Sequence, residues 1–357
     1  MQGIRSEATA PGQLDIDCLS RQKTSLYCKD FPAATRDVAR LAQTMPSLEP
    51  DLDSCLRELE ERTTDPREGI FGPRSVIWRI NRHALLFLGS GRAALLQLAH
   101  PWVAQAIEDH SSTRLDPYGR FQRTFRRVFA MVYGDLDSAI QAARKVGKLH
   151  GTIRGQLRED GGASAAGAAY RALHVPALLW VHSTLWETSI RVYETFVAPI
   201  SHEDKETYYR ETKRFALLFG ITNDSLPERW DDFLDYNRAQ WTSREIVVTK
   251  TARRLAHKIL TPPDPLFAPI SDRFLIVTSA LLPAPVRDAF ELPYGSAEER
   301  SFERTVSLLR RVLPRLPRRL RYVPPYLDAT RRLEGRTGND PVGRLMNHLY
   351  LGRMRAE

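Results

Sequence analysis

The chain contains 357 residues, 42% of them hydrophobic and 27% charged, and it carries a net charge of +9 at neutral pH. This balance is ordinary for a globular protein with a sizeable core. The longest apolar-rich stretches, 93–107 and 172–186, are shorter than the roughly 20 residues of a membrane-spanning helix. No secretory signal pattern follows the basic start. The composition argues against a membrane-spanning or secreted protein, and we expect a soluble, cytoplasmic one.

The three cysteines, Cys18, Cys28 and Cys55, all lie in the N-terminal region. No pair has the CxxC spacing of a metal clip, and an odd number gives no disulfide framework. We expect free thiols in a reducing compartment.

The positive charge is concentrated in the arginines of 309–321 and continues at Arg331, Arg332 and Arg336. Such a run fits either a surface for nucleic acid or anionic lipid, or a solvated face of a globular protein. No aromatic RNA-binding motif, zinc finger or helix-turn-helix signature accompanies it. We therefore expect no nucleic-acid partner, and the sequence leaves peripheral contact with a membrane open.

In chain order, residues 1–68 have weak periodicity and are predicted to form an irregular arm with short helices around 35–44 and 52–62. From residue 69 the apolar residues recur at steps of three and four, which is typical of helices that bury one face. Residues 69–345 are predicted to form one helical domain, followed by a C-terminal tail, 346–357. The helices expected within the domain cover 76–82, 84–99, 116–133, 137–154, 176–197, 201–219, 226–239 and 243–259. No run of alternating apolar residues predicts a sheet, so the predicted fold class is all-α.

Two of these helices have clear boundaries. Asp116 can cap free N–H groups and Pro117 fits a first turn, so they begin one helix, which stops at Gly134. The next helix carries an apolar stripe formed by Ile140, Ala143, Val146, Gly147 and Ile153. His150 falls on this stripe, so its imidazole should point inward.

A dinucleotide-like motif precedes them. Residues 89–94 (GSGRAA) match G-x-G-x-x-A, with Glu108 or Asp109 about twenty residues on. That fingerprint requires a second strand, but His100-Pro101 and another helical stretch follow instead. We therefore predict that Gly89 and Gly91 allow close helix packing, and a dinucleotide-dependent oxidoreductase stays the less favoured alternative.

Two further sets of residues can carry chemistry. Arg120, Arg123 and Thr124 share one helical face by their i, i+3, i+4 spacing, which suits an anionic group such as a haem propionate or is a plain surface face. One inward-facing helical histidine is enough to anchor haem iron, although a satisfied core histidine is the usual alternative. Zinc and di-iron sites are not indicated, because HExxH and paired Glu-x-x-His motifs are absent. The histidines of the middle of the chain are His100, His110, His150, His174 and His182.

Read together, several segments form an ordered set. They are GIFGPRSVIW (69–78), RAALLQLAHP (92–101), DHS (109–111), DPYGRFQRT (116–124), the Leu149-His150 pair and WVHSTL (180–185). This set resembles the family that contains the latex-clearing rubber oxygenases and the ER-bound fungal oxygenase of mycophenolic acid biosynthesis. The resemblance covers about residues 69–260. It implies a globin-like helical core that binds haem b and activates O2 to oxidise or cleave a lipophilic substrate, with 69–345 as the haem-binding catalytic domain.

The resemblance also implies roles for single residues. The Arg-x-x-Lys-Thr helix of the rubber oxygenases matches Arg120, Arg123 and Thr124, and the proximal histidine that binds iron falls on His150. His182 of the WVHSTL helix would lie close behind this proximal histidine and would not bind the iron itself. Arg123 stands where the rubber oxygenases have lysine, and arginine does not readily lose its proton, so a role as distal iron ligand is not expected here. For proton transfer we choose His110 over Glu108 and Asp109, because its ordinary pKa suits that task.

The sequence thus predicts a haem-b-dependent oxygenase for a small apolar metabolite, either isoprenoid or aromatic. The apolar helix with Trp180, Trp186 and Tyr193 is expected to line its pocket. A haem-dependent dehydrogenase, a peroxidase-like enzyme and a non-enzymatic haem sensor are alternatives. The sequence does not indicate the oligomeric state.

Overall fold

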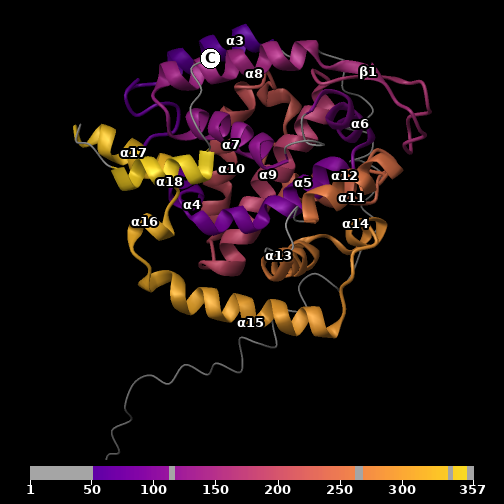
Figure 1. Ribbon diagram of the computed structural model, residues 1–357. Coiled ribbons are helices and arrows are strands. Elements are labelled where there is room, and N and C mark those ends of the chain that lie inside the picture. Colours follow the sequence, from indigo (N-terminus) through magenta and orange to yellow (C-terminus); the bar gives the residue numbers. More distant parts are fainter. Residues whose placement is uncertain (1–50, 112–116, 262–267, 337–340, 352–357) are drawn as a thin grey trace, which may run out of the picture.

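The computed structural model describes residues 51–111, 117–261, 268–336 and 341–351 (Figure 1). Within these ranges the chain forms sixteen α-helices, α3–α18, and one two-stranded sheet. The prediction of an all-α fold is confirmed. The helix expected around 35–44 and most of the predicted irregular arm lie outside the described residues. No helix in the described ranges is long and apolar enough to cross a membrane.

The first half of the chain follows the predicted order of helices with two corrections. The elements are α3 (Leu52–Arg62), α4 (Val76–Asn81), the 3-10 helix η1 (Ala84–Gly89), α5 (Ser90–Leu98), α6 (Pro101–His110), α7 (Pro117–Tyr133) and α8 (Leu136–Thr152). The single helix predicted over 84–99 is wrong, because its first half is the tighter η1. The predicted extension of α8 to residue 154 is also wrong. Ile153 is extended and ends the helix, and β1 (Arg154–Gln156) then pairs antiparallel with β2 (Ala169–Arg171).

In the second half, every regular element among the described residues is a helix. Its elements are α9 (Val175–Phe196), α10 (His202–Leu217), η3 (Asn223–Ser225), α11 (Trp230–Trp241), α12 (Lys250–Leu260), α13 (Ala268–Leu281), α14 (Ala284–Ala289), α15 (Ser296–Val312), η5 (Leu313–Arg315), α16 (Arg318–Arg321), α17 (Pro324–Leu333) and α18 (Pro341–Leu351). The predicted starts of α11 and α12 are several residues too early. The hydroxyl of Thr249 accepts from Ala252 N–H and begins α12, and Glu206 accepts from Trp230 N–H (2.9 Å) at the start of α11. Polar caps rather than the apolar period therefore define both starts.

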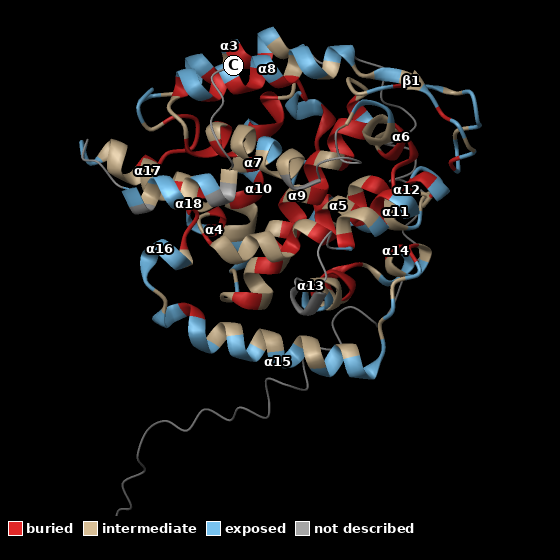
Figure 2. Ribbon diagram, viewed as in Figure 1, coloured by how far each residue is buried: buried red, intermediate tan, exposed pale blue. Residues whose placement is uncertain are grey.

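Helix α9 is the central element of the molecule, and buried residues surround it in Figure 2. It packs against η1, α5, α10, α4, α11 and α15. The main hydrophobic core includes residues of α3, α4, α7, α8, α9, α10 and α11. Helix α3 contributes Cys55, Leu56 and Leu59, all buried, so the predicted arm segment 52–62 is packed into the helical body. At the other end, α18 continues across the predicted boundary between residues 345 and 346.

Helices α7 and α8 form a hairpin that positions the candidate site. They are joined by Gly134-Asp135 and pack against each other, so they run antiparallel. Asp135 caps α8 by accepting from Ser138 N–H (2.8 Å), and hydrogen bonding to Ser138 lowers the pKa of this carboxyl. The first half of α7 therefore lies alongside the last half of α8.

Candidate functional site

Helix α7 has two chemically different faces. Its phenylalanines at i, i+4 spacing form a ladder, with ring centroids 4.4 Å apart for Phe121 and Phe125 and 5.6 Å for Phe125 and Phe129. Phe87 of η1 packs on this ladder at 5.0 Å from Phe125. At about 100° of rotation per residue, Arg120, Arg123, Thr124 and Arg127 lie on the opposite face, which we call the arginine face. The predicted triplet is thus one continuous polar face, and Arg127 is a fourth member that sequence reasoning missed.

The arginine face lies beside the C-terminal end of α8, where His150 is located. Burial, and then the charge of Arg127, lowers the pKa of His150 to about 4. Arg120 is half buried, and burial followed by the charge of Arg123 lowers its pKa. Arg123 and Thr124 are exposed. The structure therefore brings the predicted triplet and His150 to the same end of the hairpin, but only Arg120 and His150 are partly enclosed.

His150 has both ring nitrogens available. Its ring lies against Phe219, with centroids 6.2 Å apart, and no hydrogen-bond partner for either nitrogen occurs among the described residues. With a pKa near 4 the imidazole is neutral at physiological pH. A neutral imidazole with a free lone pair is the form that binds iron.

His182 is also neutral, but it is differently occupied. It is 4% exposed, and burial lowers its pKa to about 3. The indole N–H of Trp186 donates to His182 Nδ1 (3.1 Å), so the ring hydrogen must be on Nε2. Nε2 is buried and has no hydrogen-bond partner among the described residues. His182 thus presents an unused N–H donor, and its lone pair is already taken by Trp186.

Two phenylalanines separate the two histidines. Phe215 packs on His182 at 6.1 Å and on Phe219 at 5.2 Å, and Phe219 packs on His150. The rings form a continuous aromatic connection from the core of α9 to the end of α8. His150 and His182 are consequently linked through Phe215 and Phe219 and do not contact each other directly.

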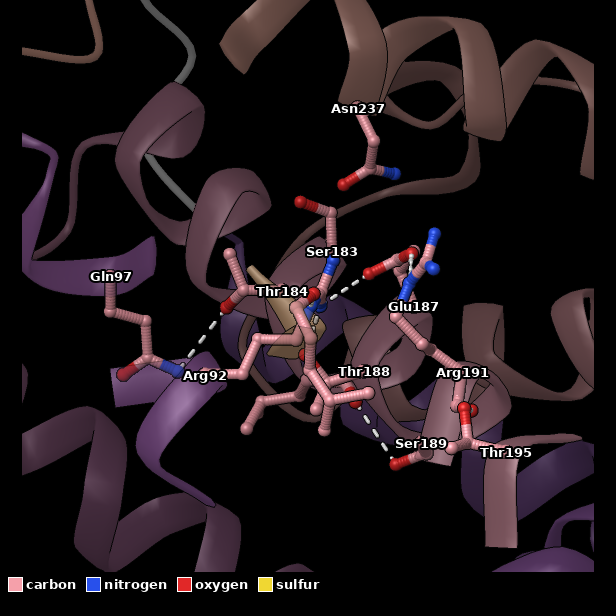
Figure 3. Close-up of polar contacts among 12 residues, drawn as sticks. Arg92, Gln97, Ser183, Thr184, Glu187, Thr188, Ser189, Arg191, Thr195 and Asn237 are labelled. Carbon is pink, nitrogen blue, oxygen red and sulfur yellow. Dashed lines mark hydrogen bonds and ion pairs between the residues drawn. The ribbon is translucent and has the colours of Figure 1, made fainter. Parts of the chain in front are cut away.

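A buried ion-pair network attaches α5 to α9 (Figure 3). Arg92, fully buried, pairs with Glu187, and its Nε donates to Leu281 O (2.7 Å). Glu187 also accepts from Arg191 Nε (3.2 Å). Burial raises the pKa of Glu187, but the charges of Arg92 and Arg191 outweigh it and hold that pKa below its usual value. Sequence reasoning missed this network, although charged residues inside the apolar segments of α5 and α9 were a visible signal.

His110 is the last residue of α6 and contacts β1, which follows the C-terminal end of α8. It is exposed, and its Nε2 is 3.1 Å from Arg154 O of β1. Its neighbour Asp109 accepts from Tyr170 OH (2.7 Å) and from Arg158 (2.5 Å), while Glu108 pairs with Arg254 (3.3 Å). These residues attach α6 to the β-hairpin and to α12. A role for His110 in proton transfer stays a prediction.

Two of the aromatic residues of α9 are buried in the core. Trp180 and Trp186 are 1% and 3% exposed, and their indole N–H groups donate to Leu96 O and His182. That the helix with Trp180, Trp186 and Tyr193 lines the substrate pocket stays a prediction.

Gly89 and Gly91 lie at helix contacts, as predicted. A Cβ at Gly89 would come within 2.6 Å of Thr188 and Val192 of α9, and a Cβ at Gly91 would overlap Thr278 and Phe274 of α13. In the described ranges no strand follows them that could complete a dinucleotide-binding unit. The packing role of both glycines is confirmed.

We expect Gly91→Ala to lower the free energy of unfolding by about 1–3 kcal/mol, because the added methyl forces the α5–α13 contact apart. Gly151→Ala is the matched control, since nothing lies within 4 Å of a Cβ there. The control should be as stable as the natural chain or slightly more stable, by up to about 1 kcal/mol. Urea denaturation measures both. Equal stability of the Gly91 variant, together with saturable binding of NAD(H), would instead support the dinucleotide alternative.

A family model for an oxygenase catalytic domain matches residues 78–311, more than half of the chain. The matched stretch runs from α4 to α15 and includes every candidate residue described above. This predominantly helical body is therefore the catalytic domain of an oxygenase. The chain belongs to the family described as ER-bound oxygenase mpaB/B'/Rubber oxygenase, catalytic domain. No curated protein and no solved structure matches it.

Proposed function

We propose that the protein is a haem-b-dependent oxygenase that uses O2 to oxidise or cleave a small apolar metabolite, such as an isoprenoid or an aromatic compound. The observation that carries this proposal is His150. It is a neutral imidazole with two available nitrogens, beside an arginine face, in a chain that belongs to an oxygenase family. When bound, haem would supply the activation of O2 that side chains alone do not provide.

His150 would hold the iron, and His182 fits that task less well. The lone pair of His182 Nδ1 accepts from Trp186, and its Nε2 carries hydrogen. To bind iron through either nitrogen, His182 would have to give up the Trp186 bond, because binding through Nε2 moves the ring hydrogen to Nδ1, which can then no longer accept. Its Nε2–H is better suited to donate a hydrogen bond to an acceptor on the cofactor or substrate. Such a bond would give this buried N–H the partner that it lacks among the described residues.

The arginine face would hold the anionic part of the cofactor. Arg120 and Arg123 can each make charge-assisted hydrogen bonds to a propionate carboxylate, and Thr124 can orient a water molecule. Arg123 keeps its proton and therefore positions and neutralises charge without acting as a base. His110 would supply a proton from the side of the β-hairpin. With the arginines engaged by carboxylates, the substrate itself is expected to be uncharged or weakly polar.

The test is a titration of the full chain with haem b, followed by oxygen uptake with apolar candidate substrates. We expect a Soret band that saturates at one haem per chain, and uptake of O2 that depends on the substrate. Arg123→Leu should reduce turnover about 100-fold, the effect of removing one strong charge-stabilising donor. Arg57→Leu on the exposed face of α3 is the control and should change nothing.

Several outcomes would contradict the proposal. Absence of a saturating Soret band would exclude haem. A Soret band without any turnover would favour the haem sensor, and turnover with an electron acceptor or peroxide instead of O2 would favour the dehydrogenase or peroxidase-like enzyme. If only polyanionic compounds perturb the haem spectrum, the arginines face the substrate and not the propionates.

A further inference from the structure

The segment from Arg304 to Arg321 has an unusual charge composition. It contains seven arginines and no aspartate or glutamate. In the structure it forms the C-terminal half of α15, η5 and α16, and α15 runs along one edge of the molecule (Figure 1).

The inner face of α15 is fully used by the fold. Phe302, Val306 and Leu309 pack against an apolar cluster from α9 and α13. Arg310 donates to the carbonyls of Glu194 (2.7 Å) and Thr195 (2.9 Å), which attaches α15 to the end of α9. These contacts hold α15 in place and direct its remaining residues outward.

The outer face combines exposed apolar and basic side chains. Leu308, Val312 and Leu320 are 60%, 39% and 53% exposed, and they are three of the five large exposed hydrophobic residues in the described part of the chain. The same segment carries exposed arginines, and Arg304, Arg311 and Arg315 follow the helical spacing of Leu308. In the described ranges none of these three arginines forms an ion pair with an acidic side chain. We call these six residues the α15–α16 face.

We propose that the α15–α16 face binds the surface of an anionic phospholipid bilayer. Phosphate headgroups attract the arginines, and the interfacial region below them accepts leucine and valine side chains. A nucleic acid would satisfy the arginines but offers little to three exposed aliphatic side chains. Acidic residues are absent over this segment, which limits repulsion from an anionic surface to the exposed Glu299 and Glu303 in the first half of α15.

The experiment is co-sedimentation of the full chain with vesicles of phosphatidylcholine alone or with about 30% phosphatidylserine. We expect binding to the anionic vesicles only, and weaker binding in high salt. Each arginine near the surface contributes about fivefold to partitioning. Arg304→Gln, Arg311→Gln and Arg315→Gln together should therefore weaken binding roughly 100-fold. Leu308→Ser, Val312→Ser and Leu320→Ser together should weaken it at least tenfold, with unchanged thermal melting because all three side chains are exposed.

The matched control combines Arg57→Gln, Arg62→Gln and Arg144→Gln on α3 and α8, at the opposite edge of the molecule (Figure 1). This control removes three positive charges, as the α15–α16 arginine variant does. Its binding to anionic vesicles should stay within twofold of that of the natural chain. The proposal is overturned if the control weakens binding as much as the α15–α16 arginine variant does. A second result would also overturn it. If the triple serine variant at Leu308, Val312 and Leu320 binds anionic vesicles as tightly as the natural chain, and a DNA duplex binds the natural chain as tightly as those vesicles do, the face recognises any polyanion.

Discussion

Replacing His150 by alanine is expected to abolish stoichiometric haem binding. Among the described residues at the arginine face, His150 is the only neutral side chain whose nitrogens have no hydrogen-bond partner and can therefore bind iron. Because burial lowers its pKa to about 4, haem binding should change little between pH 5 and 8 and should weaken as the pH falls toward 4 and the ring takes up a proton. The haem content per chain and the ferrous absorption spectrum provide the measurement.

His182→Ala is the matched variant. It removes a histidine that is more deeply buried but whose lone pair is already engaged, so it should keep the axial ligand while it lowers stability. If His150→Ala retains full haem with an unchanged ferrous spectrum, the assignment is wrong and His182 or His110 becomes the candidate. If both single variants retain haem, neither His150 nor His182 is the sole ligand of the iron.

The Glu187→Ala substitution is expected to lower the free energy of unfolding by about 3–5 kcal/mol, the usual cost of leaving a buried charge without its partner. Arg92 is fully buried, and Glu187 pairs with it and with Arg191. Because the pKa of Glu187 is lowered, its stabilising contribution is present above its ordinary value of 4.5 and lost as the pH falls through the folded-state value. Urea denaturation at neutral pH measures the effect.

Glu58→Ala supplies the control, because Glu58 pairs with Arg62 at 2.8 Å on the solvent side of α3. Exposed pairs of this kind contribute less than about 1 kcal/mol. The double replacement Arg92→Leu with Glu187→Leu should recover part of the lost stability, since it removes the fully buried charge of Arg92, whereas Arg191, which also loses Glu187, is 24% exposed. A Glu187→Ala variant as stable as the control would mean that the network contributes nothing to attaching α5 to α9.

Sequence periodicity predicted most of the helices because their apolar faces point to one core. It placed α3 and α9 to within one residue of their observed ends. It failed where a local polar group decides the boundary, as at Thr249, and where a short hairpin interrupts the helical pattern after Ile153. The division of 84–99 into η1 and α5 was not predicted, because apolar residues continue from one part into the other.

The candidate site was predicted in part. Spacing identified Arg120, Arg123 and Thr124, and the same rule extended by one turn would have found Arg127. The i, i+4 relation of His182 and Trp186 was visible in the sequence, but only the structure shows that the indole N–H donates to the imidazole. The pairing of Arg92 with Glu187 joins residues from different helices, and no local pattern in a single sequence specifies such a contact.

Cys55 is a free cysteine buried on α3, and the pKa of its thiol is raised to about 11 by burial and then by the carboxylates of Glu58 and Asp51. A thiol that does not ionise reacts slowly with oxidants, which attack the thiolate form. In a protein that handles O2, this sulfur is therefore shielded for as long as α3 remains docked. Labelling of Cys55 by a thiol reagent, read at that residue and separately from Cys18 and Cys28, would report the undocking of α3.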